Sequence, residues 1–254
     1  MNSDSKGSLL ETQTPRLKYS LEDARGQLEG LQPKERIQWA IRNFETKFAM
    51  TTSFGIQSSV LLHMLSSIDG FQRIPVIWID TGYLPKETYI YAEELINKLE
   101  INIQVVQSYI SPARMEAVYG KLWETNNIQD LEKYHSIRKV KPLEEAFAKM
   151  NIECWCSGVR GEQTKNRKSM NLIDIIRNRF SLRPLLNWSK KDIYYYMTNN
   201  KLPQHPLFDK GYSTVGDWHS SAPDNINSKG RQTRFNGLKQ ECGIHIQGVQ
   251  GEGI

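Results

Sequence analysis

Residues 47–65, KFAMTTSFGIQSSVLLHML, contain the pattern that decides the fold. The apolar run 47–52 is typical of a buried strand, the loop 53–59 is rich in small polar residues, and 60–65 is an apolar helical run. Such a loop can gather backbone N–H groups and hydroxyls around an anion at the positive end of the helix. Ordinary helix capping uses the same residues, and the loop lacks the spacing and terminal lysine of a Walker loop. The stretch predicts a strand–loop–helix unit and leaves its ligand open.

The same unit recurs further along the chain. Residues 74–79 form a β-branched run that ends at Asp80-Thr81-Gly82-Tyr83, a helical pattern covers 87–99, and 101–106 is typical of a third strand. Asp80 is a candidate acceptor for a ribose hydroxyl or an adenine amine. A helix cap followed by a turn glycine would give the same letters.

A fourth strand, 154–159, follows a long helical stretch over 112–150 and leads into the basic loop 160–168. Strands that alternate with helices predict a parallel sheet with right-handed crossovers, and such sheets bind ligands beyond the carboxyl ends of their strands. We therefore expect an α/β fold in which this loop lies at the same sheet edge as the two earlier loops. Further helices are expected at 20–28, 33–44 and 190–199, the first two as an N-terminal helical layer.

The length of 254 residues fits one α/β domain with appendages. We expect a disordered N-terminus at 1–18, one nucleotide-binding domain at 19–212 and a flexible tail at 213–254, because the tail is rich in Gly, Ser, Asn and Gln. Hydrophobic residues make up 39% of the chain, and no apolar run approaches the roughly 20 residues of a membrane-spanning helix. A membrane protein is therefore not expected.

Charge and cysteine content narrow the class of protein. There are 33 Lys and Arg against 28 Asp and Glu, a net charge of +5 that suits an anionic small molecule or nucleic acid. The three cysteines argue against a disulfide framework, and residues 1–18 lack the apolar core of a secretory signal, so a cytoplasmic location is expected. Cys154 and Cys156 lie two apart in an apolar strand and are expected to be buried core thiols rather than metal ligands.

The predicted tail presents a third cysteine among cations. Arg231, Arg234 and Lys239 precede Glu241-Cys242-Gly243-Ile244-His245. Lys239 and His245 would lower the pKa of the Cys242 thiol and favour the nucleophilic thiolate. An incidental exposed cysteine is the alternative.

Four motifs occur in order: Ser-Phe-Gly-Ile-Gln-Ser at 53–58, Asp-Thr-Gly-Tyr-Leu at 80–84, Gly-x-Arg-x-x-Gln at 158–163 and Glu-Cys-Gly-Ile-His at 241–245. Together they resemble the 3′-phosphoadenylyl sulfate reductases. The resemblance implies an adenine nucleotide α-hydrolase-like fold, with 53–58 as a modified pyrophosphate loop of the Ser-Gly-Gly-x-Asp-Ser kind. Gln57 stands where ATP pyrophosphatases have an Asp near a metal-bound triphosphate. This departure disfavours adenylation by ATP.

The resemblance also implies functional residues. The catalytic ones would be Cys242, as nucleophile, with Glu241 and His245. The substrate-binding ones would be Ser53, Phe54, Gly55, Gln57, Ser58, Asp80, Thr81, Gly82, Lys139, Gly158, Arg160, Gln163, Arg167, Arg231, Arg234 and Lys239. Their backbone amides and cations would bind and neutralise an anionic nucleotide.

Cofactor requirements follow from a comparison with a sister group. Assimilatory adenylyl sulfate reductases hold an iron–sulfur cluster through a Cys-Cys pair and a later Cys-x-x-Cys, and the corresponding residues here are Tyr134-His135 and Asp217-x-x-Ser220. Four thiolates are needed for such a cluster. We therefore expect no iron–sulfur cluster, no bound metal and no other bound cofactor, with 3′-phosphoadenylyl sulfate as the substrate.

The implied reaction releases sulfite for cysteine biosynthesis, with electrons from thioredoxin or glutaredoxin and with a homodimer as the possible assembly. Neither a nucleic-acid partner nor a membrane partner is expected. Three alternatives stay open at this point: adenylyl sulfate as the substrate, an adenylating enzyme of the ATP pyrophosphatase type, and a non-enzymatic nucleotide- or RNA-binding module.

Overall fold

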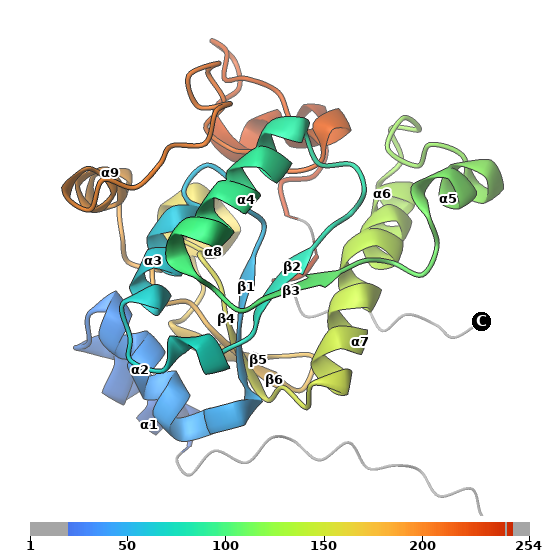
Figure 1. The fold of residues 1–254 in the computed structure, drawn as a ribbon. Helices are drawn as coiled ribbons and strands as arrows, with labels where there is room; N and C mark the ends of the chain where they lie inside the picture. The colour runs from blue at the N-terminus through green and yellow to red at the C-terminus, as the bar shows by residue number, and fades with distance from the viewer. Residues whose placement is uncertain (1–19, 242, 246–254) are drawn as a thin grey trace, which may run out of the picture.

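The computed structural model describes residues 20–241 and 243–245, and within them the chain forms a six-stranded sheet in the order β3-β2-β1-β4-β6-β5 (Figure 1). Its strands are β1 (Phe48–Thr52), β2 (Val76–Ile79), β3 (Ile103–Val106), β4 (Cys154–Cys156), β5 (Ile173–Ile176) and β6 (Arg179–Leu182). All pairings are parallel except that of β5 with β6. The predicted α/β fold with a parallel sheet is confirmed, and an antiparallel edge strand is added to it.

The unpredicted strands β5 and β6 form a tight hairpin. Arg177 and Asn178 connect them with φ angles of 46° and 59°. Positive φ at both residues of a two-residue connection matches the right-handed twist of antiparallel strands. The sequence Arg-Asn lacks the usual glycine, which is why the turn is hard to recognise in advance.

Helices begin where the sequence places start signals. Ser20, Ser111 and Ser189 each accept a hydrogen bond from a backbone N–H in the first turn of the helix that follows. The helices are α1 (Leu21–Glu29), α2 (Pro33–Phe44), α3 (Ser58–Ser66), α4 (Lys86–Leu99), α5 (Pro112–Tyr119), α6 (Ile128–His135), α7 (Lys141–Lys149), α8 (Lys165–Lys168) and α9 (Lys190–Asn199). The helical stretch predicted over 112–150 is therefore divided, and a π-helical turn, Ser136–Val140, joins α6 to α7.

Helices cover both faces of the sheet, and strand alternation divides the core between them. Phe48 and Met50 of β1 pack with residues of α1 to α4, whereas Ala49 packs on the opposite face with Leu143 and Phe147 of α7. Cys154 and Cys156 are fully buried on the first of these faces, as predicted. No helix within the described ranges is long and apolar enough to cross a bilayer.

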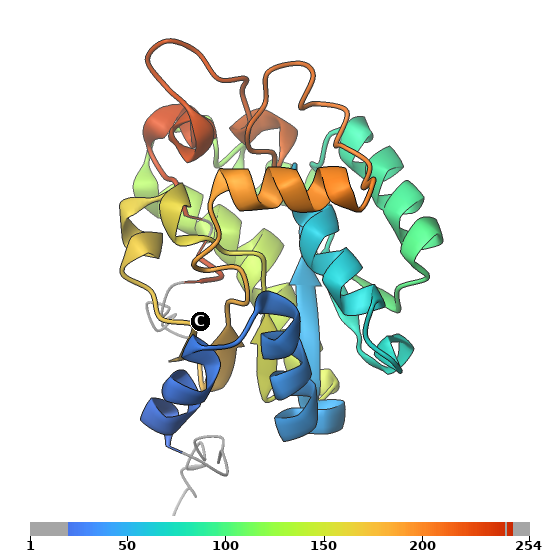
Figure 2. The same cartoon turned by 90° about the vertical axis from the view of Figure 1, so that its left-hand side faces the viewer.

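The parallel strands end at the upper edge of the sheet in Figure 1, and the chain between α9 and residue 241 crosses above that edge (Figures 1 and 2). This segment contains two short 3₁₀ helices, Trp218–Ser220 and Gly230–Gly237. It packs against the domain here, since Asp217 is 0% and Phe235 is 6% exposed. The flexibility expected for 213–254 stays a prediction, and the expectation for 1–18 falls outside the described residues.

Candidate functional site

The loop between β1 and α3 is anchored from below by Phe54. This residue has a φ of 45°, and its fully buried ring lies with its centroid 4.8 Å from that of Trp78. The Ser58 backbone N–H donates to the Gly55 carbonyl at 3.0 Å, which turns the chain into the helix. Phe54 therefore serves the loop through packing, while Ser53, Gly55 and Ser58 face a cavity above the sheet.

That cavity has a volume of about 230 Å³ and is bounded by cations. Counted over the described residues, its walls contain four of them, Lys139, Arg160, Arg167 and Arg231, and no carboxylate. Small polar groups from the β1–α3 loop and from Ser157 and Gly158 complete one side. An anion is the ligand that such walls favour.

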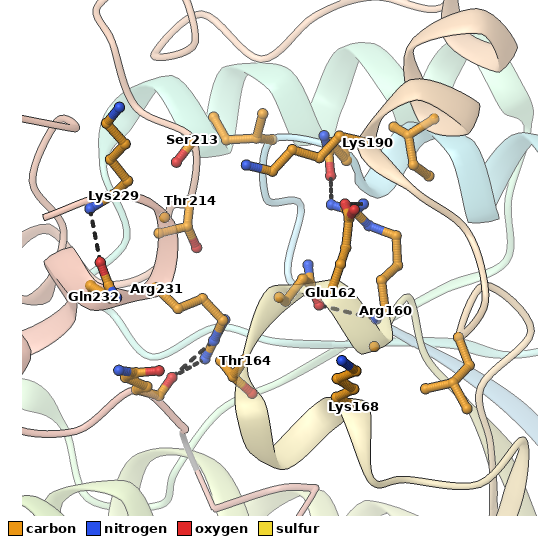
Figure 3. A pocket seen from close by; sticks show the side chains of 18 of the residues that line it. Arg160, Glu162, Thr164, Lys168, Lys190, Ser213, Thr214, Lys229, Arg231 and Gln232 are labelled. Atoms are coloured by element: carbon orange, nitrogen blue, oxygen red, sulfur yellow. Dashed lines mark hydrogen bonds and ion pairs between the residues drawn. The ribbon is translucent and has the colours of Figure 1, made fainter.

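A larger and more open cavity, of about 1800 Å³, adjoins the first one (Figure 3). Arg160, Gln163 and Arg231 line both cavities. Further cations, including Lys165, Lys168, Lys190 and Lys229, line only the larger one. The larger cavity is thus a cationic approach to the smaller one.

Arg160 is buried and is held in place by hydrogen bonds to neighbouring side chains. It is 3% exposed, and its guanidinium donates to the side chains of Gln57 and Glu162 (Figure 3). Its backbone N–H donates to Gln163 Oε1 at 3.0 Å. Gln57 therefore positions a cation here, at the place where ATP pyrophosphatases have a carboxylate.

Arg167 binds Glu241 in a bidentate ion pair. The distances are 2.9 Å from Nε to Oε1 and 2.7 Å between Arg167 Nη2 and Glu241 Oε2. Thr164 donates its hydroxyl to the same carboxylate at 2.9 Å, and Arg231 lies 3.6 Å from it. Burial alone would raise the pKa of Glu241, but the hydrogen bond from Arg167 and the charges of both arginines keep it below its usual range. Glu241 is therefore an anionic anchor.

The chain beyond residue 242 is held as well. Arg177 donates to the carbonyl oxygen of Ile244 at 2.8 Å and to that of Gly243 at 3.3 Å. The His245 ring stacks on Trp155 with centroids 5.3 Å apart. Burial, followed by nearby arginine charges, lowers the pKa of His245 well below its usual value. A low pKa disfavours a positive charge on this imidazole. The expectation that His245 lowers the pKa of the Cys242 thiol stays a prediction, because residue 242 lies outside the described residues.

Comparison with known proteins places this site in a family. The phosphoadenosine phosphosulfate reductase domain model matches residues 47–223. A phosphoadenosine 5′-phosphosulfate reductase of Synechococcus is 49% identical over 233 residues, which cover 91% of this chain and 100% of that protein. The chain belongs to the phosphoadenosine phosphosulfate reductase family.

Other relatives agree with this assignment. The Synechocystis protein of the same name is 46% identical over 90% of this chain and 92% of its own length. The crystal structure of phosphoadenylyl-sulfate reductase from Candida auris, a phosphate complex, aligns with a TM-score of 0.69 and 25% identity over 82% of this chain and 100% of that one. Yeast FAD synthetase shares the fold alone, at a TM-score of 0.52, 15% identity, and coverage of 85% of this chain and 73% of that one.

Most residues that the reductase motifs predicted lie at these two cavities. The smaller cavity is lined by Ser53, Gly55, Gln57, Ser58, Lys139, Gly158, Arg160, Gln163, Arg167, Arg231 and His245. Lys239 and Glu241 line the larger one. Cys242, the predicted nucleophile, lies outside the described residues, but its neighbours Glu241 and Gly243 are both held at the site.

Asp80, Thr81 and Gly82, in contrast, line neither of the two cavities, although Leu84 at the end of the same motif lines the smaller one. The Asp80 carboxylate accepts hydrogen bonds from Gly82 N at 2.8 Å, Tyr89 Oη at 2.6 Å and Gln107 Nε2 at 2.7 Å. Gly82 has a φ of 73°, a conformation that favours glycine. These hydrogen bonds hold the loop as a turn, and the role of Asp80 and Gly82 in substrate binding stays a prediction.

Thr81 and Arg234 also lie away from the cavity walls, next to Asp217. Thr81 donates its hydroxyl to Asp217 at 2.6 Å. Arg234 is 4% exposed, donates to Ser221 at 3.3 Å, and lies against Gly216. Both residues thus lie behind the cavity walls, and their role in substrate binding stays a prediction.

Two functional candidates were missed from the sequence. Arg177 holds the chain after residue 242, and Asp217 forms a 2.6 Å ion pair with Lys139. The hairpin turn gave no recognisable signal for Arg177. For Asp217 a signal existed, because it is a carboxylate at a position equivalent to a cluster ligand of the sister group.

Buried neutral histidines predict acid sensitivity. Burial lowers the pKa of His135 to about 2 and those of His205 and His219 to about 4. Unfolded histidines titrate near 6.5, so below that pH the unfolded chain binds more protons and the folded state loses stability. Urea unfolding should show a loss that starts near pH 6.5 and continues to pH 4, with a slope of up to about 1.4 kcal/mol per pH unit for each histidine. A constant free energy of unfolding from pH 7 to pH 4.5 would contradict this.

Proposed function

We propose that this protein reduces 3′-phosphoadenylyl sulfate to sulfite and adenosine 3′,5′-bisphosphate in sulfate assimilation. The observation that carries the proposal is the cavity with four cations and no carboxylate among its described walls, at the carboxyl edge of the sheet. The proposed substrate, 3′-phosphoadenylyl sulfate, combines an adenine nucleotide with sulfate and phosphate groups, and these anionic groups suit a cationic cavity. The curated relatives named above carry the same activity in their names.

In the first step the Cys242 thiolate attacks the sulfate sulfur. The bond from sulfur to the bridging oxygen breaks, adenosine 3′,5′-bisphosphate leaves with the electron pair, and Cys242 becomes an S-sulfonate. Arg160, Arg167, Arg231 and Lys139 offset the repulsion between thiolate and substrate. The backbone amides of the β1–α3 loop contribute further donors.

In the second step a thiol of a reduced dithiol protein attacks the Cys242 sulfur and displaces sulfite. The second thiol of that protein then breaks the mixed disulfide, so its two electrons end on sulfite. Cys154 and Cys156 do not supply this thiol, because both are fully buried and burial raises the pKa of each. Thioredoxin, or glutaredoxin, is therefore the proposed donor, in the cytoplasm.

The proposed reaction needs no iron–sulfur cluster. The chain has three cysteines, fewer than the four thiolates of such a cluster. At the positions equivalent to the cluster ligands, Tyr134, His135, Asp217 and Ser220 are all buried. His219 Nε2 lies 3.0 Å from the Tyr134 hydroxyl, and its ring stacks on Trp123 at 4.1 Å. Packed aromatic and polar side chains do not fit a cluster there.

Parallel kinetics with adenylyl sulfate and with its 3′-phosphorylated form test the proposal. With reduced thioredoxin, sulfite release should be about 10- to 100-fold more efficient with the 3′-phosphate, the worth of one or two charge-assisted hydrogen bonds. Equal efficiency, or a preference for adenylyl sulfate, would contradict the substrate assignment. Release of pyrophosphate from ATP without sulfite production would indicate an adenylating enzyme instead.

A further inference from the structure

Asp217 is a fully buried carboxylate whose two oxygens are both engaged. Oδ1 accepts the Thr81 hydroxyl at 2.6 Å, and Oδ2 lies 2.6 Å from the Lys139 ammonium. The side chains of Asp217 and Lys139 are 0% and 10% exposed. Although burial alone would raise the pKa of Asp217, the charges of Lys139 and Arg234 hold it well below its usual value. The carboxylate is therefore ionised.

Lys139 stands between this carboxylate and the substrate cavity. It belongs to the π-helical turn Ser136–Val140 and lines the smaller cavity, whereas Asp217 does not. An ammonium carries three donors, so its pairing with Asp217 leaves donors for an anion in the cavity. The Asp217 carboxylate therefore contacts Lys139 but does not itself line the cavity.

Other side chains keep the Asp217 carboxylate itself from moving. The hydroxyls of Ser220 and Ser221 donate to the Asp217 carbonyl oxygen at 3.0 Å and 2.9 Å. The backbone N–H of Trp218 donates to the Tyr83 carbonyl at 2.7 Å, which fixes the chain next to Asp217. A lysine side chain loses rotamer entropy when it is ordered. A fixed Asp217 carboxylate orders the Lys139 side chain before the ligand binds.

We propose that Asp217 is a positioning residue, which holds the Lys139 ammonium at the cavity so that it binds an anionic group of the sulfonucleotide. This inference rests on the proposed function. Without Asp217, Lys139 would be a buried cation without its counterion, and nothing would hold its ammonium at one place in the cavity wall. Asp217 also lies near Arg234, so one carboxylate balances two buried cations.

The test is a mutant cycle with Asp217→Asn, Lys139→Met and the double variant. Asparagine keeps an oxygen for the Thr81 hydroxyl, and it replaces the charged Oδ2 that faces Lys139 by an amide nitrogen, which does not accept a hydrogen bond. Asp217→Asn should raise KM for 3′-phosphoadenylyl sulfate and lower kcat/KM by on the order of 100-fold, the effect of a misplaced binding group. The double variant should be no worse than Lys139→Met, because Asp217 acts through that lysine.

Calorimetry gives a second readout. It measures binding of adenosine 3′,5′-bisphosphate and of 3′-phosphoadenylyl sulfate to variants that also carry Cys242→Ser, which prevents turnover. Asp217→Asn should weaken binding of at least one of the two. Asp174→Asn is the matched control, since it removes another ion-paired carboxylate, 2.9 Å from Arg183, away from both cavities. It should change neither KM nor binding.

A lower kcat with unchanged KM and binding, or additive losses in the double variant, would show a merely structural role and overturn the inference. If Asp217→Asn does not fold, Thr81→Val gives the same test through a smaller rise in KM. It removes the 2.6 Å hydrogen bond to Oδ1, together with the 3.2 Å bond that the Tyr83 backbone N–H donates to the Thr81 hydroxyl. An unchanged KM in that variant would count against the inference. Failure of the unsubstituted protein to reduce either sulfonucleotide would instead refute the proposed function.

Discussion

Cys242→Ser is expected to abolish sulfite production while leaving nucleotide binding intact. Serine has nearly the same size but does not provide a thiolate at neutral pH, and loss of a nucleophile lowers kcat by on the order of 10⁶-fold. Cys154 and Cys156 do not replace it, because they are fully buried in β4. Kinetics with reduced thioredoxin and calorimetry with adenosine 3′,5′-bisphosphate measure the two expectations separately.

The proposed S-sulfonate intermediate can be tested directly by mass spectrometry. Anaerobic incubation of the unsubstituted protein with 3′-phosphoadenylyl sulfate should add one SO₃ group to the intact mass, and reduced thioredoxin should remove it. Cys242→Ser should gain nothing. Cys154→Ala, which alters a core thiol, is the matched control and should still gain one group. Turnover by Cys242→Ser at the unsubstituted rate, or an SO₃ group on another residue, would refute the scheme.

Local sequence signals predicted the scaffold well. The run 47–65 contains a strand, a small-residue loop and a helix, and each has a distinct hydrophobic period or turn chemistry. Because parallel strands end at one edge of a sheet, the prediction that the basic loop after β4 lies beside the β1–α3 loop is also confirmed. The hairpin of β5 and β6 escaped because its turn residues, Arg177 and Asn178, are unusual at positive φ.

Pairings between distant side chains explain what the sequence could not predict. Glu241 lies 74 positions from Arg167 in the chain, and Thr81 lies 136 positions from Asp217. Each pair forms only because folding brings two loops to the same sheet edge. The motif resemblance implied a catalytic role for Glu241, and the position of Asp80 after a strand made it a candidate acceptor. Neither inference revealed the side chains that bind these two carboxylates in the fold.

Breaking the pair between Arg167 and Glu241 should separate two functions of the site. Removal of one partner of a buried ion pair costs about 3–5 kcal/mol. Arg167→Met removes the anchor of Glu241 together with one of the cations that line the cavity, so kcat/KM should fall on the order of 10³-fold and binding of adenosine 3′,5′-bisphosphate should weaken. Glu241→Gln removes only the anchor charge, so it should lower kcat on the order of 100-fold without weakening nucleotide binding.

The contrast between the two variants decides the role of Glu241. Glu153→Gln is the matched control, since it removes a carboxylate paired with Lys47 at 2.5 Å, next to the start of β4 and away from both cavities. It should leave kcat and binding unchanged. Equal weakening of nucleotide binding by Glu241→Gln and Arg167→Met would mean that Glu241 serves the nucleotide site. If only Arg167→Met weakens binding, Glu241 holds the chain next to Cys242 at the cavity, where the thiolate must meet the sulfate.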